Sequence, residues 1–405
     1  MSLQSPRAPV PLDILLSESY IFDPRPHYPL LSTLKRFWNP SWTDSNSPDG
    51  LTLLFTHGTG FHKEQWEPTI DYLLELIRVS TASSSTQQRP SLNSRNNNNN
   101  IKIREIWTID APKHGDAGVL NEKSLRNGYE PAFPKWQEYA HNIHAFLTGR
   151  GQTLLGTYLE SDLEDNRTVI PNFDFSNHTL VCIGHSIGAI SLLLSLDLVP
   201  SIASFINISS MIFIEPMTMP PTLGSFKDLA EKLASGSRSR RDVWPSAEEA
   251  YKMFKTRRTW QSWDDRVLKI FVDTGLRPLP TLHYPNTQHG SGTLTLKCTR
   301  EQETATYRET HGWDKIYRNL PSYASRVRIH IYYGKIHDFI AKECKENVIN
   351  TAAGGPQNFA SIGFIDGAGH TAPQQKPRGV AEKIFEAIEA DTKDRLKGDF
   401  FQAKL

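Results

Sequence analysis

The chain has 405 residues, of which 38% are hydrophobic, 10% aromatic and 22% charged. This composition supports a sizeable buried core and excludes a wholly disordered chain. Lys and Arg number 45 against 44 Asp and Glu, so no global charge attracts nucleic acid or an anionic membrane. The three cysteines form no disulfide framework or zinc ribbon, and no apolar run approaches the ~18–20 residues of a transmembrane segment.

Short β-rich runs alternate with helical patterns along the chain. This rhythm predicts an α/β fold with a mostly parallel central sheet and helices on both faces. The predicted strands are residues 51–56, 101–109, 179–183, 211–214, 326–333 and 361–365. The predicted helices are residues 63–79, 136–147, 187–198 and 380–390.

The pattern divides the chain into a core and an inserted cap. Residues 1–217 and 326–398 are expected to form the two parts of the core, residues 218–325 a mainly helical cap, and residues 399–405 a C-terminal tail. In the first part, residues 80–100 are polar and end in five consecutive asparagines, which predicts a disordered surface insertion. In the cap, Ser246 followed by Glu249 is a capping box that predicts a helix start.

The sequence Gly184-His185-Ser186-Ile187-Gly188 lies between a buried strand and an apolar helix. A serine on such a tight strand-to-helix turn holds its hydroxyl above the edge of the sheet, and the flanking glycines let the backbone cross closely. We therefore interpret Ser186 as a nucleophile.

A serine nucleophile needs a base, and the order of residues for this turn is serine, then acid, then histidine. His370 follows the last predicted strand on a Gly-rich loop, so we expect it to be the base. Four further histidines are expected to shape loops and pocket walls: His57, His62, His114 and His185.

Two carboxylates compete to orient the imidazole. Glu215 ends the strand after the elbow and Asp338 follows the next one, so both lie at the carboxyl edge of the sheet. Burying a carboxylate at the end of an apolar strand is costly without a partner. This favours Glu215, and Asp338 remains the alternative.

The tetrahedral intermediate needs backbone donors for its oxyanion. The loop after the first predicted strand offers the N–H of Thr59 or Gly60, and Ile187 follows the nucleophile. No dinucleotide fingerprint, phosphate loop or zinc spacing is present, so we expect neither a cofactor nor a metal.

Together these residues resemble the α/β-hydrolase superfamily over about residues 51–390. Within it, the chain resembles fungal peroxisomal hydrolases of secondary metabolism, such as those of AK-toxin and mycophenolic acid biosynthesis. The segments that carry this likeness are Gly60–Trp66, Arg240–Ser246, Trp263-Asp264, Thr295–Cys298 and the C-terminal Ala403-Lys404-Leu405. The resemblance implies a peroxisomal serine hydrolase of acyl-CoA thioesters in fungal toxin biosynthesis, with Glu215 as the acid.

Three functions stay open at this point. The first is hydrolysis of an acyl-CoA thioester. Seven cations of the predicted cap either contact the CoA phosphates or simply form a solvated helix face. The second is a carboxylesterase or carbon–carbon hydrolase acting on a polyketide, and the third is a non-catalytic binding protein. The cations are Arg238, Arg240, Arg241, Lys252, Lys255, Arg257 and Arg258.

The last three residues, Ala403-Lys404-Leu405, are one conservative step from the Ser-Lys-Leu peroxisomal address. They predict a peroxisomal matrix protein that binds the import receptor, with the cytoplasm as the alternative location. The sequence predicts no oligomeric state.

Overall fold

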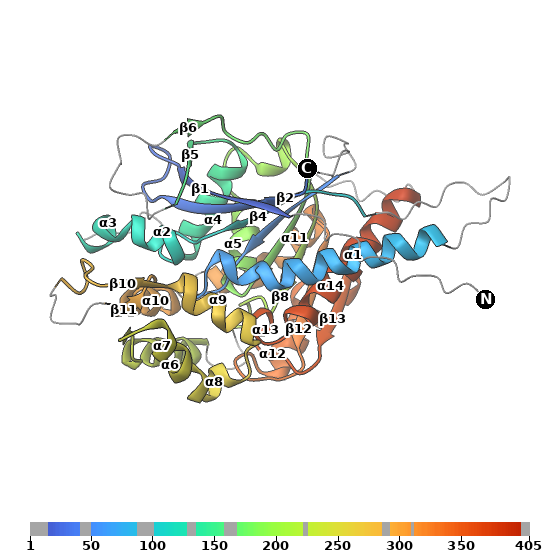
Figure 1. Cartoon of the computed structure of the whole chain (residues 1–405). Coiled ribbons are helices and arrows are strands. Elements are labelled where there is room, and N and C mark those ends of the chain that lie inside the picture. Colours follow the sequence, from blue (N-terminus) through green and yellow to red (C-terminus); the bar gives the residue numbers. More distant parts are fainter. Residues whose placement is uncertain are drawn as a thin grey trace, which may run out of the picture.

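The structure is a computed structural model that describes residues 15–40, 50–86, 101–127, 135–157, 168–221, 226–285, 292–308 and 312–397. Within these ranges the chain builds a ten-stranded sheet in the order β13-β12-β8-β7-β3-β4-β2-β1-β5-β6 (Figure 1). Its strands are β1 (Leu16–Asp23), β2 (Ser32–Trp38), β3 (Leu51–Thr56), β4 (Ile103–Ile109), β5 (Gln152–Leu155), β6 (Val169–Ile170), β7 (Thr179–His185), β8 (Asn207–Ile214), β12 (Ile329–Gly334) and β13 (Ser361–Ile365).

The six strands from β13 to β4 in this order run parallel to their neighbours. They are the six that the sequence predicts, and they confirm the expected α/β fold with a mostly parallel sheet. The four remaining strands are antiparallel and were not predicted. Parallel strands that are covered on both faces read as apolar runs, whereas β1 is exposed at its start and β5 and β6 together contain one buried residue, Thr153.

Helices cover both faces of the sheet. On one face, α1 (Glu67–Thr86) packs against α14 (Pro377–Lys397). On the other, α4 (Lys135–Leu147) and α11 (Gly312–Arg326) pack against α5 (Ile187–Ser195). The shorter helical segments are Lys63–Trp66, α2 (Gly115–Leu120), α3 (Glu122–Arg126), Ile202–Ser204, α12 (Lys342–Asn347), Val348–Ala352, Pro356–Asn358 and α13 (Ala372–Gln375).

Two boundaries differ from the sequence predictions. Helix α1 continues through residues 80–86, which were expected to belong to the disordered insertion; residues 87–100 lie outside the described part of the chain. Helix α11 falls within the range expected for the cap, yet its buried face joins the core cluster around α5. Its buried apolar positions join the core of the sheet domain, while Trp313 near its start contacts Phe226 of the cap.

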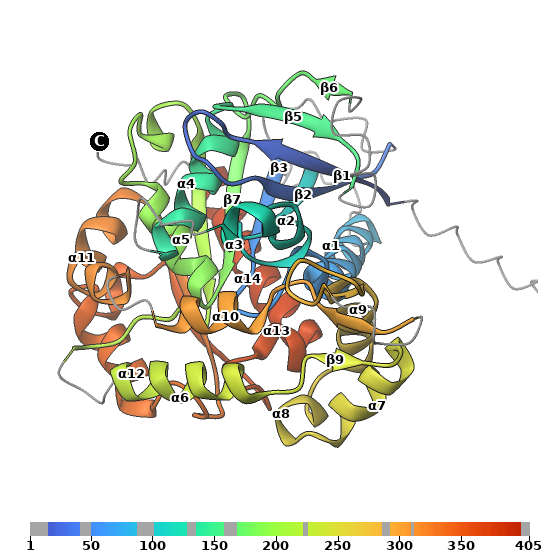
Figure 2. The ribbon, with the colours of Figure 1, turned by 90° about the vertical axis from the view of Figure 1, so that its left-hand side faces the viewer.

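The remaining elements between β8 and β12 lie together at one end of the sheet (Figure 2). Five helices and a small antiparallel sheet form the described part of this region, and that sheet was not predicted because its strands are only two or three residues long. Ser246 accepts a hydrogen bond from the N–H of Glu249, as the capping box predicts. The elements are α6 (Phe226–Ser239), β9 (Val243–Trp244), α7 (Ala247–Thr256), α8 (Arg258–Gln261), α9 (Asp265–Gly275), β10 (Leu276–Pro278), β11 (Leu294–Leu296) and α10 (Arg300–Tyr307).

The cap has an aromatic cluster of its own. Trp244, Phe254, Trp263 and Phe271 are buried in it and Trp260 packs against them. Most aromatic residues of this region therefore stabilise the cap itself.

No helix in the described ranges combines the length and the apolar character that crossing a membrane requires. The C-terminal Ala403-Lys404-Leu405 lies outside those ranges.

Candidate active site

Ser186 lies on the turn between β7 and α5, as the glycine pattern predicts. Its backbone φ of 54° falls in the left-handed region, which strains any residue other than glycine. A Cβ on Gly184 would lie 2.5 Å from Cα of Ala189, and one on Gly188 would lie 2.6 Å from the carbonyl oxygen of Thr56. Both glycines are therefore needed for the close backbone crossing that holds this hydroxyl above the sheet.

His370 is brought to Ser186 by the loop that follows β13. Its Nε2 lies 3.0 Å from Ser186 Oγ, although the two residues are 184 positions apart. His185 Nε2 donates a hydrogen bond of 2.7 Å to the backbone carbonyl of His370, which fixes this loop against the elbow. Burial and the neighbouring His370 lower the pKa of His185 to about 3, so His185 stays neutral and acts as a brace.

The two competing carboxylates both reach His370, but through different atoms. Glu215 Oε2 lies 3.2 Å from Nδ1 of the imidazole. Asp338 Oδ1 accepts the backbone N–H of His370 at 2.8 Å and that of Phe339 at 2.8 Å. The geometry therefore directs Glu215 at the ring, while Asp338 holds the loop that carries it.

Glu215 is fully buried and also has a left-handed φ, of 49°. Its second oxygen, Oε1, accepts the backbone N–H of Gly334 at 2.6 Å and the ammonium of Lys345 at 2.6 Å. Burial alone would raise the pKa of Glu215, but His370 and then Lys345 outweigh burial and hold that pKa below its usual value. A carboxylate facing Nδ1 favours the tautomer whose Nε2 is free to accept the Ser186 proton.

Two of the three predicted oxyanion donors lie with Ser186. Thr59 and Ile187 line the same pocket, and neither N–H donates a hydrogen bond within the described part of the chain. Gly60, with φ of 81°, lines a neighbouring hollow instead.

His57 holds the loop that carries Thr59. Its Nδ1 lies 2.8 Å from the carbonyl of Gly58, and its Nε2 lies 3.0 Å from the backbone N–H of Ala111, which donates to it. One nitrogen donates and the other accepts, so the ring is neutral. Burial accordingly lowers the pKa of His57 to about 4. The interpretation of His57 as a loop-shaping residue agrees with these contacts.

A buried charge network lies behind this loop. The Lys63 ammonium contacts Asp110 Oδ2 at 2.9 Å and Asp116 Oδ2 at 2.7 Å. Asp116 also accepts a hydrogen bond of 2.5 Å from Lys297, which follows β11 of the cap. Although burial opposes the charged form, the three carboxylates around Lys63, which include Glu64, raise its pKa well above the usual value. The network thereby joins the loop, α2 and the cap.

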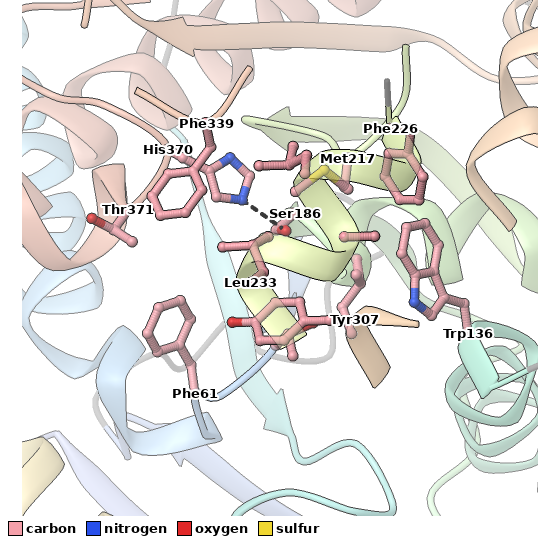
Figure 3. A pocket seen from close by; sticks show the side chains of 14 residues that line it. Phe61, Trp136, Ser186, Met217, Phe226, Leu233, Tyr307, Phe339, His370 and Thr371 are labelled. Atoms are coloured by element: carbon pink, nitrogen blue, oxygen red, sulfur yellow. Dashed lines mark hydrogen bonds between the residues drawn. The ribbon is translucent and has the colours of Figure 1, made fainter. Parts of the chain in front are cut away.

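An apolar pocket opens over Ser186 (Figure 3). It encloses about 540 Å³, part of it open to solvent. Helix α6 lines it with positions spaced as one helical face, Phe226, Leu229, Ala230 and Leu233, while Trp136 and Tyr307 close other sides. The full lining is Thr59, Phe61, Trp136, Ser186, Ile187, Met217, Phe226, Leu229, Ala230, Leu233, Tyr307, Phe339, His370 and Thr371.

Several cap cations are paired with acids. Arg240 pairs with Glu303, Lys252 with Glu248, and Lys255 with Asp265. These three cations therefore form ion pairs with neighbouring acids, as expected for a solvated helix face, and are not free to bind phosphate.

Across the ranges that the structure describes, no group of three or more His, Cys, Asp or Glu side chains could hold a metal ion.

Lys345 is the contact of this site that sequence reasoning missed. It lies on α12, where four of six residues are charged, so no apolar pattern marks one side of the helix as buried. The contact is evident only in the structure, where 1% of the Lys345 side chain is exposed and its ammonium lies beside Glu215.

Comparison with known proteins gives three results. Residues 53–383 match a family model described as the Alpha/beta hydrolase family. The type I acyl-CoA thioesterase mpaH of Penicillium brevicompactum is 27% identical over 242 residues, which cover 59% of this chain and 43% of the relative. The corresponding thioesterase of Penicillium roqueforti is 24% identical with the same coverage, so the matched part spans less than half the length of these relatives.

Two solved structures share the fold. The peroxisomal alpha-beta-hydrolase Lpx1 of Saccharomyces cerevisiae superposes with a TM-score of 0.62 at 17% identity, covering 93% of this chain and 88% of that one. An alpha/beta hydrolase of Novosphingobium aromaticivorans superposes with a TM-score of 0.54 at 11% identity, covering 92% of this chain and 98% of that one.

Proposed function

Because the chain belongs to the alpha/beta-hydrolase family, we propose that it is a serine hydrolase with Ser186 as nucleophile, His370 as base and Glu215 as the orienting acid. One observation carries the proposal. Ser186 Oγ lies 3.0 Å from His370 Nε2, and His370 Nδ1 lies 3.2 Å from Glu215 Oε2. Proton transfer from a nucleophile to an oriented base needs this continuous set of hydrogen-bond distances.

In the first half-reaction, Ser186 Oγ attacks the substrate carbonyl while His370 Nε2 takes its proton. The negative charge on the tetrahedral oxygen is stabilised by the backbone N–H groups of Thr59 and Ile187. Glu215 stabilises the imidazolium. When the carbonyl re-forms, the bond to the leaving group breaks and the leaving group takes the proton from His370.

In the second half-reaction, water replaces the leaving group. His370 takes a proton from the water as its oxygen attacks the acyl-enzyme, and the same donors stabilise the second oxyanion. The ester bond to Ser186 then breaks, and Ser186 recovers its proton from His370. The net reaction is hydrolysis of an acyl derivative to a carboxylic acid.

The proposed substrate is an acyl-CoA thioester. Two features support this choice: the matched relatives are acyl-CoA thioesterases, and the pocket beside Ser186 is lined mainly by apolar side chains that suit the acyl group. The resemblance to fungal secondary-metabolite hydrolases extends the proposal to a toxin or related biosynthetic pathway.

The test compares leaving groups on one set of acyl chains. Purified protein is assayed on short, long and aromatic acyl-CoA thioesters by release of free thiol, and on p-nitrophenyl esters of the same acids. We expect thioester hydrolysis that disappears in Ser186→Ala. Ester turnover without any thioester cleavage would contradict the thioester substrate and favour a carboxylesterase. Cleavage of β-diketones alone would favour a carbon–carbon hydrolase.

A fluorophosphonate probe separates all these enzymes from a binding protein on the same scaffold. The wild type should label at Ser186, and Ser186→Ala should not. A folded wild type that fails to label would contradict the serine-hydrolase proposal as a whole.

We further propose a peroxisomal location, supported by the Ala403-Lys404-Leu405 terminus. A fluorescent protein fused to the N-terminus of the chain should enter peroxisomes. Removal of the last three residues should leave it in the cytoplasm, and an unchanged distribution would contradict import through this signal.

A further inference from the structure

Lys345 is a buried lysine whose ammonium pairs with one carboxylate among the described residues, and that carboxylate belongs to the acid of the proposed triad. Its ammonium donates to Glu215 Oε1 at 2.6 Å, to the carbonyl of Gly334 at 3.0 Å and to that of Ile336 at 3.4 Å. It also lies 5.3 Å from the centre of the Tyr333 ring. Oxygen acceptors and an aromatic face thus surround the charge in place of water.

The contacts divide the two oxygens of Glu215 between different tasks. Lys345 and the N–H of Gly334 both bind Oε1, which leaves Oε2 for the imidazole of His370. The carboxylate is therefore held from behind, and its rotation about the terminal bond would break two short hydrogen bonds.

The same lysine braces the loop that presents His370. Lys345 binds the carbonyls of Gly334, which ends β12, and of Ile336, which lies in the turn that follows. In that turn, the N–H of Ile336 donates to the carbonyl of Ala368 at 2.9 Å, two residues before His370. Lys345 thus contacts both the acid and the turn that supports the base.

From these contacts, and resting on the proposed function, we infer that Lys345 is a positioning residue that keeps Glu215 directed at His370. The ammonium also offsets the negative charge of Glu215 as sensed by the imidazole. An uncompensated carboxylate would stabilise the imidazolium more strongly, and His370 would then stay protonated to higher pH.

Four other titratable side chains lie around this cluster: Tyr333, Cys344, His185 and Asp338. Burial raises the pKa of Tyr333 and of Cys344, so both stay neutral. His185 is neutral because its pKa lies at about 3. Asp338 faces the backbone N–H of His370 rather than the ring. Within the described part of the chain, Glu215 is thus the charged side chain that contacts the imidazole of His370, and Lys345 is the cation that contacts Glu215.

The experiment measures the rate of Ser186 labelling by a fluorophosphonate probe as a function of pH, which requires no known substrate. In Lys345→Met we expect the acid limb of the profile to move up by on the order of one to two pH units. The plateau rate should fall by up to about 100-fold as Glu215 loses its fixed orientation.

Lys345→Arg keeps the charge and should keep the acid limb at its wild-type position. Lys342→Met is the matched control on the same helix, because Lys342 is exposed and pairs only with Glu346 within the described part of the chain. It should reproduce the wild-type profile. If Lys345→Met does not fold, Lys345→Gln replaces it as the neutral variant.

A folded neutral variant with the wild-type acid limb and plateau would overturn the inference. A shift of equal size in Lys345→Arg would also overturn it, because it would attribute the effect to packing rather than to charge. A wild type that does not label at Ser186 contradicts the proposed function itself, so the two failures are distinguishable.

Discussion

Replacing Glu215 with glutamine removes one charge from a buried pair without changing its shape. Its carboxylate and the Lys345 ammonium are 2.6 Å apart with 0% and 1% of their side chains exposed. At an effective dielectric constant of about 20, this separation corresponds to roughly 6 kcal/mol of attraction, which desolvation of both ions partly offsets. Leaving the ammonium buried without its carboxylate should therefore cost about 3–5 kcal/mol of unfolding free energy.

The same substitution should disable catalysis. The amide oxygen can still accept from Gly334 and Lys345, which directs the NH₂ group at Nδ1 of His370. That nitrogen must then be an acceptor, so Nε2 carries the proton and cannot take the one on Ser186. We expect the rate constant of hydrolysis or labelling to fall by about 10⁴-fold.

The assay is a double-mutant cycle at pH 7 with Glu215→Gln, Lys345→Met and the combined variant, each unfolded in urea. The pH is chosen from the sign of the linkage. The pKa of Glu215 is lower in the folded protein than in the unfolded chain, where it is near 4.5. Its ionisation therefore stabilises the fold at pH values above about 4.5, and this stability is lost as the pH falls through the pKa of the folded state.

The loss of unfolding free energy in the combined variant should be smaller than the sum of the losses in the two single variants, by about 2 kcal/mol or more. The reason is that the combined variant leaves neither charge buried without its partner. Additive losses would refute the reasoning, since they would mean that the two groups do not interact. Full activity of Glu215→Gln would refute its role as the orienting acid and would turn attention to Asp338.

Three further predictions concern the elbow, the pocket and acid stability. Gly188→Ala places a Cβ 2.6 Å from the carbonyl oxygen of Thr56, so it should abolish labelling and lower the urea-unfolding free energy by about 2 kcal/mol or more. Ala230→Trp fills part of the pocket beside Ser186, so kcat/KM for long or aromatic acyl groups should fall by about tenfold or more while the shortest acyl group is retained. Because burial lowers the pKa of His57 to about 4 and of His185 to about 3, the unfolded chain binds more protons below pH ~6.5. Stability should therefore fall between pH 6.5 and 4 by about 2 kcal/mol or more per histidine, measured as the urea midpoint at pH 7 and pH 4.5.

The first two of these predictions have a matched control variant. Gly236→Ala is the control for the elbow, because the added Cβ would meet no atom within 4 Å beyond its chain neighbours and the backbone of its own helix. Equal losses in the two alanine variants would contradict the packing argument. Lys232→Trp places the same indole side chain on the exposed side of α6, and should leave the acyl preference unchanged. A urea midpoint that does not change between the two pH values would contradict the burial of neutral histidines.

The sequence by itself determined the local features of this protein. Apolar runs predicted the six parallel strands, because a strand buried on both faces can carry few polar residues. Gly184 and Gly188 identified the elbow, because only glycine tolerates the backbone crossing on either side of Ser186. The loop after β13 was identified as the source of the base, because the order of the chain leaves few histidines at the carboxyl edge of the sheet.

Tertiary structure alone decided how the charges pair. Glu215 and Asp338 follow adjacent parallel strands, so position along the chain leaves both at the same edge. Which of the two carboxylates contacts Nδ1 of His370 depends on the length of each side chain and on the left-handed backbone conformation at Glu215. Lys345 carries no signal at all in its local sequence, since a lysine on a short charged helix normally faces water. Its burial beside Glu215 follows from the packing of α12 against the turn after β12, and a contact between residues 130 positions apart exists only once the chain has folded.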